Sequence, residues 1–328
     1  MKILIRLPNW LGDVVMSTAF VEGVRKFYPE AQIDVIIKKE LSGLVSLIPG
    51  LHTIHSFSKQ DYKGLSGVYS FGKKLRSEKY ELFFCLPDSL SSAVMGWATS
   101  AKKRIGFGKE GRLFLLTNNY KKPLNIHRTD EYIYLLEQFT GKKISERSVK
   151  LDVKQTVQPG NFVVINFNSE AVSRRMPLDK GKHLIKTLTN AFKTTKFAIV
   201  GSAKEAPYID QLLSDAANGS HLENYAGKTN LEALCNLMAS AKAVLTTDSG
   251  PAHLANSLGI PTIVLFGAGN EFNTAPYNKQ HLTVIRAGQL ICEPCVRNTC
   301  KLYGIPKCMQ LIDELEIVKT LSLYLEHA

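Results

Sequence analysis

The stretch Val244-Leu-Thr-Thr-Asp-Ser-Gly-Pro-Ala-His-Leu-Ala-Asn-Ser-Leu-Gly-Ile-Pro-Thr-Ile-Val-Leu-Phe-Gly267 decides the fold of this chain. An apolar run from Ala243 to Leu245 leads into a short polar turn. Pro251 suits the first helical position, because its φ is preset and its missing N–H would have no partner there. A second apolar run, over 261–266, follows the helical segment. The stretch therefore predicts a strand, a tight turn, a helix and a second strand.

The predicted turn is crowded with polar groups. Asp248, Ser249 and His253 lie within six residues, whereas an ordinary crossover needs one capping side chain. The N–H groups of a helix starting at Gly250 would face the carboxyl end of the strand, where open α/β sheets bind ligands. We therefore expect an anion site here, with a phosphate as its natural ligand. The alternative is a buried crossover whose polar turn only caps a helix.

Two series of short apolar runs, separated by helical patterns, predict two parallel sheets. The expected strands cover 3–7, 32–37, 52–57 and 81–86 in the first series, and 161–166, 196–201, 243–247 and 261–266 in the second. The segment over 153–160 contains Gln158-Pro-Gly and has the composition of a linker, so we place a hinge there. The fold class is therefore α/β, with two Rossmann-like domains over 1–155 and 156–328.

The last residues, 311–328, predict an amphipathic helix. This helix should pack on the second domain or cross back to the first. Its apolar face comprises Leu311, Ile312, Leu315, Val318, Leu321 and Leu325.

Composition narrows the class of protein and its partners. The chain has 328 residues, 45% of them hydrophobic and 21% charged, which is typical of a soluble globular protein. No apolar run approaches the roughly 20 residues that span a bilayer, and the N-terminus lacks the features of a signal peptide, so we expect a cytoplasmic protein.

The positive charge is concentrated in the first half of the chain. Residues 1–155 hold 25 Lys and Arg against 15 Asp and Glu, which accounts for +10 of the net +12. Such an excess attracts nucleic acid, anionic lipid or an acidic substrate. We expect no nucleic acid partner, because the sequence lacks zinc-finger spacing, RNP-like aromatic motifs and a basic helix with heptads. An anionic acceptor at a membrane surface agrees equally well with the charge.

Three further segments place reactive side chains after expected strands. Asp13 lies in the first turn of a helix beginning near Gly12, where it could act as a general base or only compensate the helix dipole. Arg174 and Arg175 follow the strand over 161–166 and suit a diphosphate, with surface solvation as the alternative. Glu205 follows the strand over 196–201 and could accept hydrogen bonds from ribose hydroxyls or favour a helix start.

Four cysteines lie close together near the end of the chain, in the pattern Cys292-x2-Cys295-x4-Cys300-x7-Cys308. Such a group raises the question of a zinc or iron–sulfur site. The spacing matches neither kind of site well, and no His is interleaved. We therefore expect neither a metal nor another cofactor. Cys85 and Cys235 lie in apolar runs and are expected in the core.

Taken together, these segments resemble glycosyltransferase family 9, the lipopolysaccharide heptosyltransferases, and most closely its heptosyltransferase II group. The resemblance runs nearly end to end. It is carried by Leu7-Pro-Asn-Trp-Leu-Gly-Asp-Val-Val-Met16, Gly201-Ser-Ala-Lys-Glu205, Ala226-Gly-Lys-Thr-Asn-Leu231, the block from Thr247 to His253, and the closing Cys-x-Pro-Cys with its later Cys-Met pair.

The resemblance implies a GT-B fold, in which two Rossmann-like domains face a cleft. It implies an inverting, metal-independent enzyme that moves L-glycero-D-manno-heptose from ADP-heptose to the inner core of lipopolysaccharide. The acceptor would bind residues 1–155 and the donor residues 156–328. The enzyme would be cytoplasmic and peripheral on the anionic inner face of the inner membrane.

The resemblance also implies roles for individual residues. Asp13 would be the catalytic base, Asp248 would hold the heptose hydroxyls, and Arg174, with Arg175 beside it, would contact the donor phosphates. Ser249, Gly250 and His253 would face the diphosphate, Thr229 the adenine and Glu205 the ribose. Met176 stands where the family has Trp, which leaves the donor's identity open.

Three alternatives stay open at this stage. A family 9 transferase with a different donor or acceptor would share all of these motifs. A GT-B nucleotide-sugar epimerase would use the same donor site without an acceptor. A non-catalytic binding protein would keep the phosphate site and turn over no activated sugar.

Overall fold

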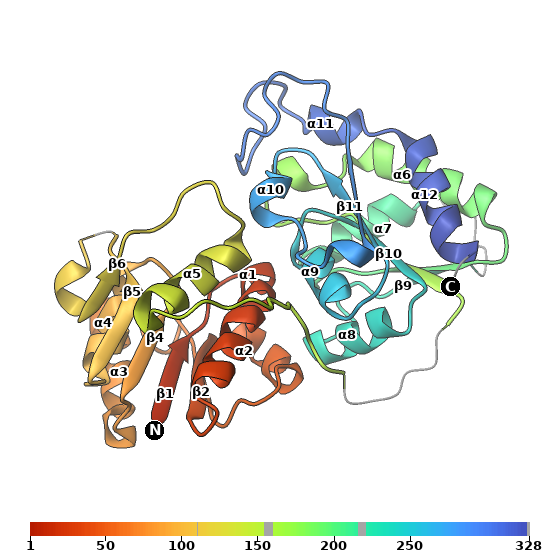
Figure 1. Ribbon diagram of the computed structural model, residues 1–328. Coiled ribbons are helices and arrows are strands. Elements are labelled where there is room, and N and C mark those ends of the chain that lie inside the picture. The colour runs from red at the N-terminus through yellow and green to blue at the C-terminus, as the bar shows by residue number, and fades with distance from the viewer. Residues whose placement is uncertain (110, 154–159, 216–220, 327–328) are drawn as a thin grey trace. The chain divides into compact units, whose positions relative to one another are not determined.

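The computed structural model describes residues 1–109, 111–153, 160–215 and 221–326 (Figure 1). It divides into two compact units, Met1–Asp152 and Val153–Ala328, called unit 1 and unit 2 below. The expected boundary between residues 155 and 156 lies outside the described residues, as does the expected hinge apart from its end residues 153 and 160.

Unit 1 contains a six-stranded parallel sheet in the order β3-β2-β1-β4-β5-β6. Its strands are β1 (Lys2–Arg6), β2 (Gln32–Lys38), β3 (Ile54–Phe57), β4 (Leu82–Cys85), β5 (Lys103–Phe107) and β6 (Asn118–Tyr120). Its α-helices are α1 (Leu11–Met16), α2 (Thr18–Phe27), α3 (Gly64–Lys74), α4 (Leu90–Ala98) and α5 (Arg128–Thr140). Short 3-10 helices are η1 (Lys39–Leu47), η2 (Arg76–Glu78) and η3 (Leu113–Leu115).

Neighbouring residues of β4 show that helices cover both faces of this sheet. Phe83 belongs to a buried cluster with residues of α3 and α4. The next residue, Phe84, makes edge-to-face contacts with Phe20 of α2, at 5.2 Å between ring centroids, and with Phe139 of α5, at 5.5 Å. Successive strand side chains point to opposite faces. This explains why the central strands are continuous apolar runs rather than alternating ones.

Unit 2 repeats the architecture with the strand order β12-β11-β10-β7-β8-β9, again all parallel. Its strands are β7 (Phe162–Asn166), β8 (Lys196–Ile199), β9 (Leu222–Asn224), β10 (Ala243–Thr247), β11 (Thr262–Phe266) and β12 (Leu282–Arg286). Its α-helices are α6 (Leu178–Ala191), α7 (Ala206–Leu213), α8 (Leu231–Ala239), α9 (Gly250–Ser257), α10 (Glu271–Thr274), α11 (Lys307–Gln310) and α12 (Glu314–Glu326), and its 3-10 helices are η4 (Val172–Arg174) and η5 (Lys279–His281).

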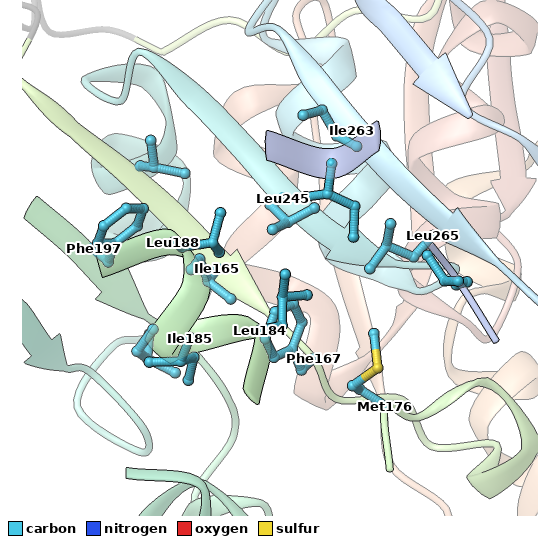
Figure 2. Packing of buried hydrophobic residues seen from close by; sticks show 14 of the residues in the cluster. Ile165, Phe167, Met176, Leu184, Ile185, Leu188, Phe197, Leu245, Ile263 and Leu265 are labelled. Atoms are coloured by element: carbon cyan, nitrogen blue, oxygen red, sulfur yellow. The ribbon is translucent and has the colours of Figure 1, made fainter. Parts of the chain in front are cut away.

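The core of unit 2 lies between the sheet and its helices. Figure 2 shows Leu184 and Leu188 of α6 beside Ile165 of β7 and Leu245 of β10. All four side chains are fully buried. Met176, at the position of the family Trp, belongs to the same cluster and is 1% exposed. Residue 176 therefore contributes to the core.

In each sheet the order in which strands are added reverses next to the first strand, and we call this point the change of direction of the sheet. In unit 1, β1 lies between β2 and β4, and in unit 2, β7 lies between β8 and β10. Loops that leave two such neighbouring strands in opposite directions open a crevice at their carboxyl ends, and ligands of open α/β sheets bind there. The loops after β1 and β4, and those after β7 and β10, are therefore the places to look for function.

The eight expected strands are all present, with shifts of one or two residues at some ends, and β10 matches its expected range 243–247. Four strands were not expected: β5, β6, β9 and β12. Two of these, β6 and β9, have three residues each at a sheet edge, and their polar sequences Asn-Asn-Tyr and Leu-Glu-Asn show no apolar run. β5 begins inside the basic cluster at Lys102-Lys103-Arg104, which reads as surface from the sequence.

The C-terminal helix α12 packs on α6 and on β10, β11 and β12 of its own unit, so its packing requires no crossing to unit 1. Leu321 is buried as expected. The expected apolar face is wrong at Leu315, which is 76% exposed, whereas Ile317 is fully buried. The helix begins at Glu314 rather than 311, and this later start leaves Leu315 in its exposed first turn.

We predict that Ile317→Ala lowers the free energy of unfolding by about 2–5 kcal/mol, because it leaves a cavity between α12 and the sheet. The matched variant Leu315→Ala should change it by less than about 0.5 kcal/mol. Chemical denaturation followed by circular dichroism measures both values. An equal loss in the two variants would contradict the packing described here.

Candidate active site

Asp248 and Arg174 form a partly buried ion pair where the sheet of unit 2 changes direction. Asp248 follows β10 and is 3% exposed, and its backbone N–H donates to Leu265 O of β11 at 3.2 Å. Arg174 ends η4, in the loop after β7. Its Nη1 lies 3.1 Å from Asp248 Oδ2. The sequence predicted both residues as donor ligands, and the structure brings them together.

Burial sets the chemistry of this pair. It raises the pKa of the Asp248 carboxyl to about 6, against the smaller lowering effects of Arg174 and Arg286. Although Asp248 Oδ2 is within ion-pair distance of Arg174, the geometry is not that of a hydrogen bond, and no other hydrogen-bond partner is found for this oxygen among the described residues. A buried carboxylate oxygen without a hydrogen bond is costly. A ligand hydroxyl that donated to it would remove that cost.

Gly269 makes room for the Asp248 carboxylate. A Cβ at position 269 would overlap Asp248 Oδ2. Arg286 fixes the surrounding loop, because its guanidinium donates to Gly267 O at 2.6 Å and to Gly269 O at 2.5 Å, and pairs with Glu271 at 2.5 Å. We call Gly267-Ala-Gly269 the glycine loop. The sequence alone did not indicate a role for this loop or for Arg286.

The first turn of α9 has no side-chain cap. Ser249 is the N-cap residue, but its side chain makes no capping hydrogen bond. Its hydroxyl instead accepts from Asn166 Nδ2 at 2.9 Å and donates to Thr247 O at 3.1 Å. The N–H groups that begin a helix have no intrahelical partner and attract negative charge. Gly250 therefore presents a backbone suited to a phosphate, beside Arg174 and Asp248.

An amide network that the sequence did not reveal connects the strand ends around this turn. Asn166 Nδ2 donates to Thr246 Oγ1 at 3.0 Å as well as to Ser249. Asn168 Nδ2 donates to Val200 O at 3.1 Å, at the end of β8. Thr247 Oγ1 donates to Asn168 O at 2.6 Å. These bonds hold the loops after β7, β8 and β10 in one arrangement.

The cysteine-containing segment packs on both sides of the ion pair. The Ser173 N–H, next to Arg174, donates to Asn298 O at 3.1 Å, and the Val296 N–H donates to Ala268 O at 2.8 Å, next to Gly269. Burial raises the pKa of the Cys308 thiol to about 11. In the ranges that the structure describes, no three His, Cys, Asp or Glu side chains are gathered as metal ligands.

The remaining predicted donor residues lie in different surroundings. Arg175 turns away from Asp248: its Nη2 donates to Ser169 O at 3.1 Å, and its guanidinium lies 5.5 Å from the centre of the Tyr208 ring. Glu205 Oε2 accepts from the Ser202 N–H and hydroxyl, both at 2.8 Å, so it also caps the turn before α7.

The last two predicted donor residues are His253, which lies on α9, and Thr229, which lines a surface hollow. His253 is 6% exposed, between the buried Ala252 and Leu254 of α9. Thr229 lines an open hollow of about 830 Å³ whose other lining residues are Glu223, Asn224, Tyr225, Lys228, Ala233, Asn236, Leu237 and Ser240.

In unit 1, Asp13 lies in the first turn of α1, after β1, with a side chain that is 25% exposed. Its Oδ1 is 3.7 Å from Nε of Arg128, at the start of α5. Burial lowers the pKa of the Arg128 guanidinium, but the interactions with Tyr132, Glu131 and Asp13 together raise it by more. The pKa is therefore raised above its ordinary value. Asp13 therefore has a permanent positive neighbour.

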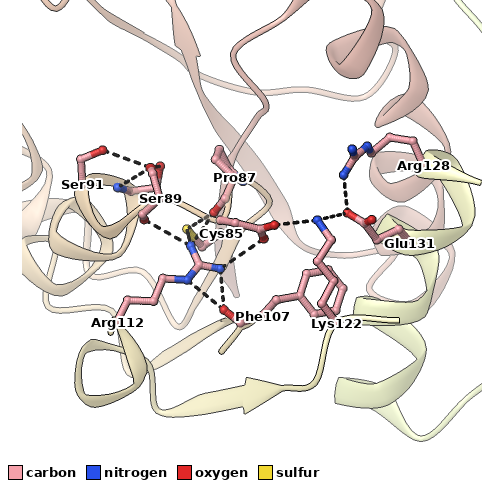
Figure 3. A network of polar contacts seen from close by, with 11 residues as sticks. Cys85, Pro87, Ser89, Ser91, Phe107, Arg112, Lys122, Arg128 and Glu131 are labelled. Atoms are coloured by element: carbon pink, nitrogen blue, oxygen red, sulfur yellow. Dashed lines mark hydrogen bonds and ion pairs between the residues drawn. The ribbon is translucent and has the colours of Figure 1, made fainter. Parts of the chain in front are cut away.

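A chain of charged groups extends from Arg128 across the carboxyl ends of the sheet, and Figure 3 shows it. Glu131 pairs with Arg128 at 2.7 Å and with Lys122 at 2.6 Å. Lys122 also pairs with Asp88 at 2.6 Å, in the loop after β4. Fully buried Arg112 lies 3.6 Å from Asp88 and donates to Phe107 O at 2.8 and 2.6 Å. Sequence reasoning found only Asp13 of this group, because its members are distant in sequence and form no motif.

Comparison with known proteins identifies the chain. The model of glycosyltransferase family 9 (heptosyltransferase) matches residues 68–305. The chain belongs to glycosyltransferase family 9. It is 30% identical to lipooligosaccharide heptosyltransferase 2 of Haemophilus influenzae over 319 residues, which cover 89% of this chain and 90% of the relative. Members of this family are glycosyltransferases, so the prediction that the chain is a glycosyltransferase is confirmed.

Solved structures of family 9 confirm the fold. ADP-heptose lps heptosyltransferase II of E. coli is similar with a TM-score of 0.84 and 23% identity, and each chain is covered completely. E. coli heptosyltransferase WaaC with ADP gives a TM-score of 0.78 at 14% identity, covering 99% of this chain and 100% of the other. The predicted α/β fold of GT-B type, with two Rossmann-like parallel sheets, is therefore correct. Helices long and apolar enough to span a membrane are not found among the described residues of this transferase.

The pKa of Asp248 predicts how the stability of this family 9 chain depends on pH. The folded value is about 6 and the ordinary value 3.8, so between these values the folded state binds more protons, and the free energy of unfolding falls as the pH rises. From pH about 4 to about 7, the wild type should lose about 2 kcal/mol relative to Asp248→Asn.

Denaturation curves of the two proteins across this pH range give the difference. Asp215→Asn serves as the control, because Asp215 is an exposed carboxylate of unit 2 whose pKa is lowered by its hydrogen bond from Lys182. The wild type should not lose stability relative to Asp215→Asn as the pH rises. A difference between wild type and Asp248→Asn that stays constant with pH would contradict the burial effect.

Proposed function

We propose that this family 9 transferase moves L-glycero-D-manno-heptose from ADP-heptose to the inner core of lipopolysaccharide, with inversion at the anomeric carbon. The observation that carries the proposal is the buried Asp248–Arg174 pair beside the uncapped first turn of α9. The Asp248 carboxylate can accept hydrogen bonds from sugar hydroxyls. Arg174 and the N–H groups at the start of α9 can bind a diphosphate beside it. ADP-heptose also appears in the name of the similar E. coli enzyme.

The proposal assigns the donor to residues 156–328. The diphosphate would lie against Arg174 and the N–H groups from Gly250 onward, with Ser249 and His253 beside it, and the heptose hydroxyls would donate to Asp248. Adenine would occupy the open hollow at Thr229. Glu205 would take the ribose hydroxyls, exchanging its present bonds to Ser202. Arg175 would hold the loop after β7 through Ser169 and Tyr208.

Residues 1–155 would bind the anionic acceptor and supply the base. The acceptor hydroxyl gives its proton to Asp13 while its oxygen forms the bond to the anomeric carbon. The bond to the ADP oxygen breaks on the opposite face, and its electron pair leaves with ADP. Arg128, whose Nε lies 3.7 Å from Asp13 Oδ1, would orient the carboxylate toward the acceptor hydroxyl. The negative charge that develops on the diphosphate is stabilised by Arg174 and the start of α9. These groups perform the reaction without a metal or other cofactor.

The acceptor places the enzyme at a membrane. One relative is named as a heptosyltransferase of the lipopolysaccharide core and another as a lipooligosaccharide heptosyltransferase, and we take the acceptor of this chain to be a lipid of that kind. We propose that this chain acts in the cytoplasm as a peripheral protein on the anionic inner face of the inner membrane, where its excess of positive charge in residues 1–155 is attracted.

The proposed function is tested by incubating the purified chain with ADP-heptose and a panel of truncated core acceptors, and reading the products by mass. We expect one heptose added to an inner-core acceptor, and transfer that persists in EDTA. Loss of the donor without acceptor, giving an epimerised nucleotide sugar, would instead indicate an epimerase. No turnover with any acceptor would contradict the proposal.

Asp13→Asn should retain ADP binding and lose turnover by about 10²-fold or more, because the amide cannot take the proton. Asp61→Asn is the matched control, since Asp61 is an exposed Asp of unit 1 whose ion-pair partner Lys39 is 3.9 Å away. Its turnover should stay at the wild-type value. Near-normal turnover of Asp13→Asn would remove Asp13 from the mechanism.

Arg174→Gln should lower kcat/KM by about 10²–10³-fold, since it removes the charge that stabilises the leaving diphosphate. Arg175→Gln should lower it by less than about tenfold, because its guanidinium contacts Tyr208 and Ser169 instead. Steady-state kinetics at varied ADP-heptose measures both. Equal losses would show that the two arginines share the phosphate.

A further inference from the structure

Unit 1 has an exposed apolar face that its core does not use. On α3, Leu65 is 50% exposed, and Tyr69 lies one turn later on the same side of the helix. Trp97 of α4 is 49% exposed, and its ring centroid lies 5.4 Å from that of Tyr69. These side chains therefore form a continuous strip over two packed helices.

The strip continues onto η3. Leu115 and Leu116 pack against Ala93, Leu90 and Val94 of α4, which fixes η3 against that helix. The two residues before them, Leu113 and Phe114, remain 51% and 79% exposed. We call Leu65, Tyr69, Trp97, Leu113 and Phe114 the apolar strip. Exposed apolar patches of this kind mark an interaction site.

The surroundings of the apolar strip are strongly basic. Residues 63–109 contain nine Lys and Arg against three Asp and Glu, a net +6 and half of the charge of the whole chain. Lys73 follows Tyr69 by one turn of α3, and Lys63 and Lys102 flank the two helices. All three lysines are exposed, and none forms an ion pair with another described residue. Their charge is thus available to a partner.

We propose that the apolar strip and these lysines dock the enzyme on an anionic phospholipid bilayer. The inference rests on the proposed function, whose acceptor is a membrane lipid, and it names the surface that makes the contact. Aromatic and aliphatic side chains enter the boundary between headgroups and acyl chains, and Trp and Tyr are favoured at that depth. Lysines around them are attracted to the anionic headgroups.

A second exposed apolar segment provides a comparison. Ile291, Leu302 and Tyr303 of unit 2 are also exposed, at 101%, 63% and 44%. Residues 287–307 contain three basic side chains and one acidic side chain, a net +2. The segment over 63–109 is about twice as long and carries three times this net charge, so its larger total charge favours the strip on unit 1 as the surface that meets an anionic bilayer.

The test is sedimentation of the full-length protein with vesicles of phosphatidylcholine alone and with added phosphatidylglycerol. The wild type should bind the anionic vesicles, and less so in high salt. The double variant Trp97→Ser/Phe114→Ser should bind about tenfold more weakly or worse. Each of Lys73→Gln and Lys102→Gln should weaken binding about fivefold. The matched variant Leu302→Ser should bind as the wild type does.

Transfer to a core acceptor freed of its acyl chains separates this inference from the proposed function. All of these variants should transfer heptose to that soluble acceptor at the wild-type rate, which also shows that they are folded. A wild type that transfers but does not bind anionic vesicles would overturn the docking surface alone. So would an equal loss in Leu302→Ser, or light scattering that shows the strip to be an interface between two copies of the chain.

Discussion

The site in unit 2 depends on keeping a carboxylate charged where water is largely excluded. Burial raises the pKa of Asp248 to about 6, and the positive charges of Arg174 and Arg286 offset this effect only in part. Three features make the arrangement possible: the change of direction between β7 and β10 brings the two loops together, Gly269 leaves room for the carboxylate, and Arg286 holds the glycine loop. A charge held at such cost suggests a role in binding rather than in stability.

In unit 1 the same architecture places a carboxylate in different surroundings. Asp13 lies at the corresponding change of direction, beside β1, but is more exposed and stands next to a permanent cation, Arg128. The ion pairs that continue through Glu131, Lys122 and Asp88 hold α5 and the loops after β4 and β6 around it. One sheet type thus supports a buried carboxylate suited to hydroxyl recognition and an accessible one suited to proton transfer.

Much of the fold was predictable because parallel strands covered on both faces are continuous apolar runs, as in β1 and β10. The short edge strands β6 and β9 were not, since pairing with a neighbour rather than their own sequence creates them. Among the proposed functional residues, Asp13, Arg174 and Asp248 follow strand ends, so the sequence alone pointed to them. The supporting residues Asn166, Gly269, Arg286 and Arg128 could not, because only tertiary structure brings them to their partners. From the sequence, Met176 was interpreted as a substitution at the donor site. Its side chain is buried, so it belongs to the core.

We propose that Asp248 recognises the sugar of the donor while the rest of the unit 2 site recognises ADP. Calorimetric titration of ADP-heptose and of ADP into the wild type and Asp248→Asn tests it directly. We expect the variant to keep its affinity for ADP and to lose most of the additional affinity that the heptose provides in the wild type. An unchanged ratio of the two affinities in Asp248→Asn would contradict it.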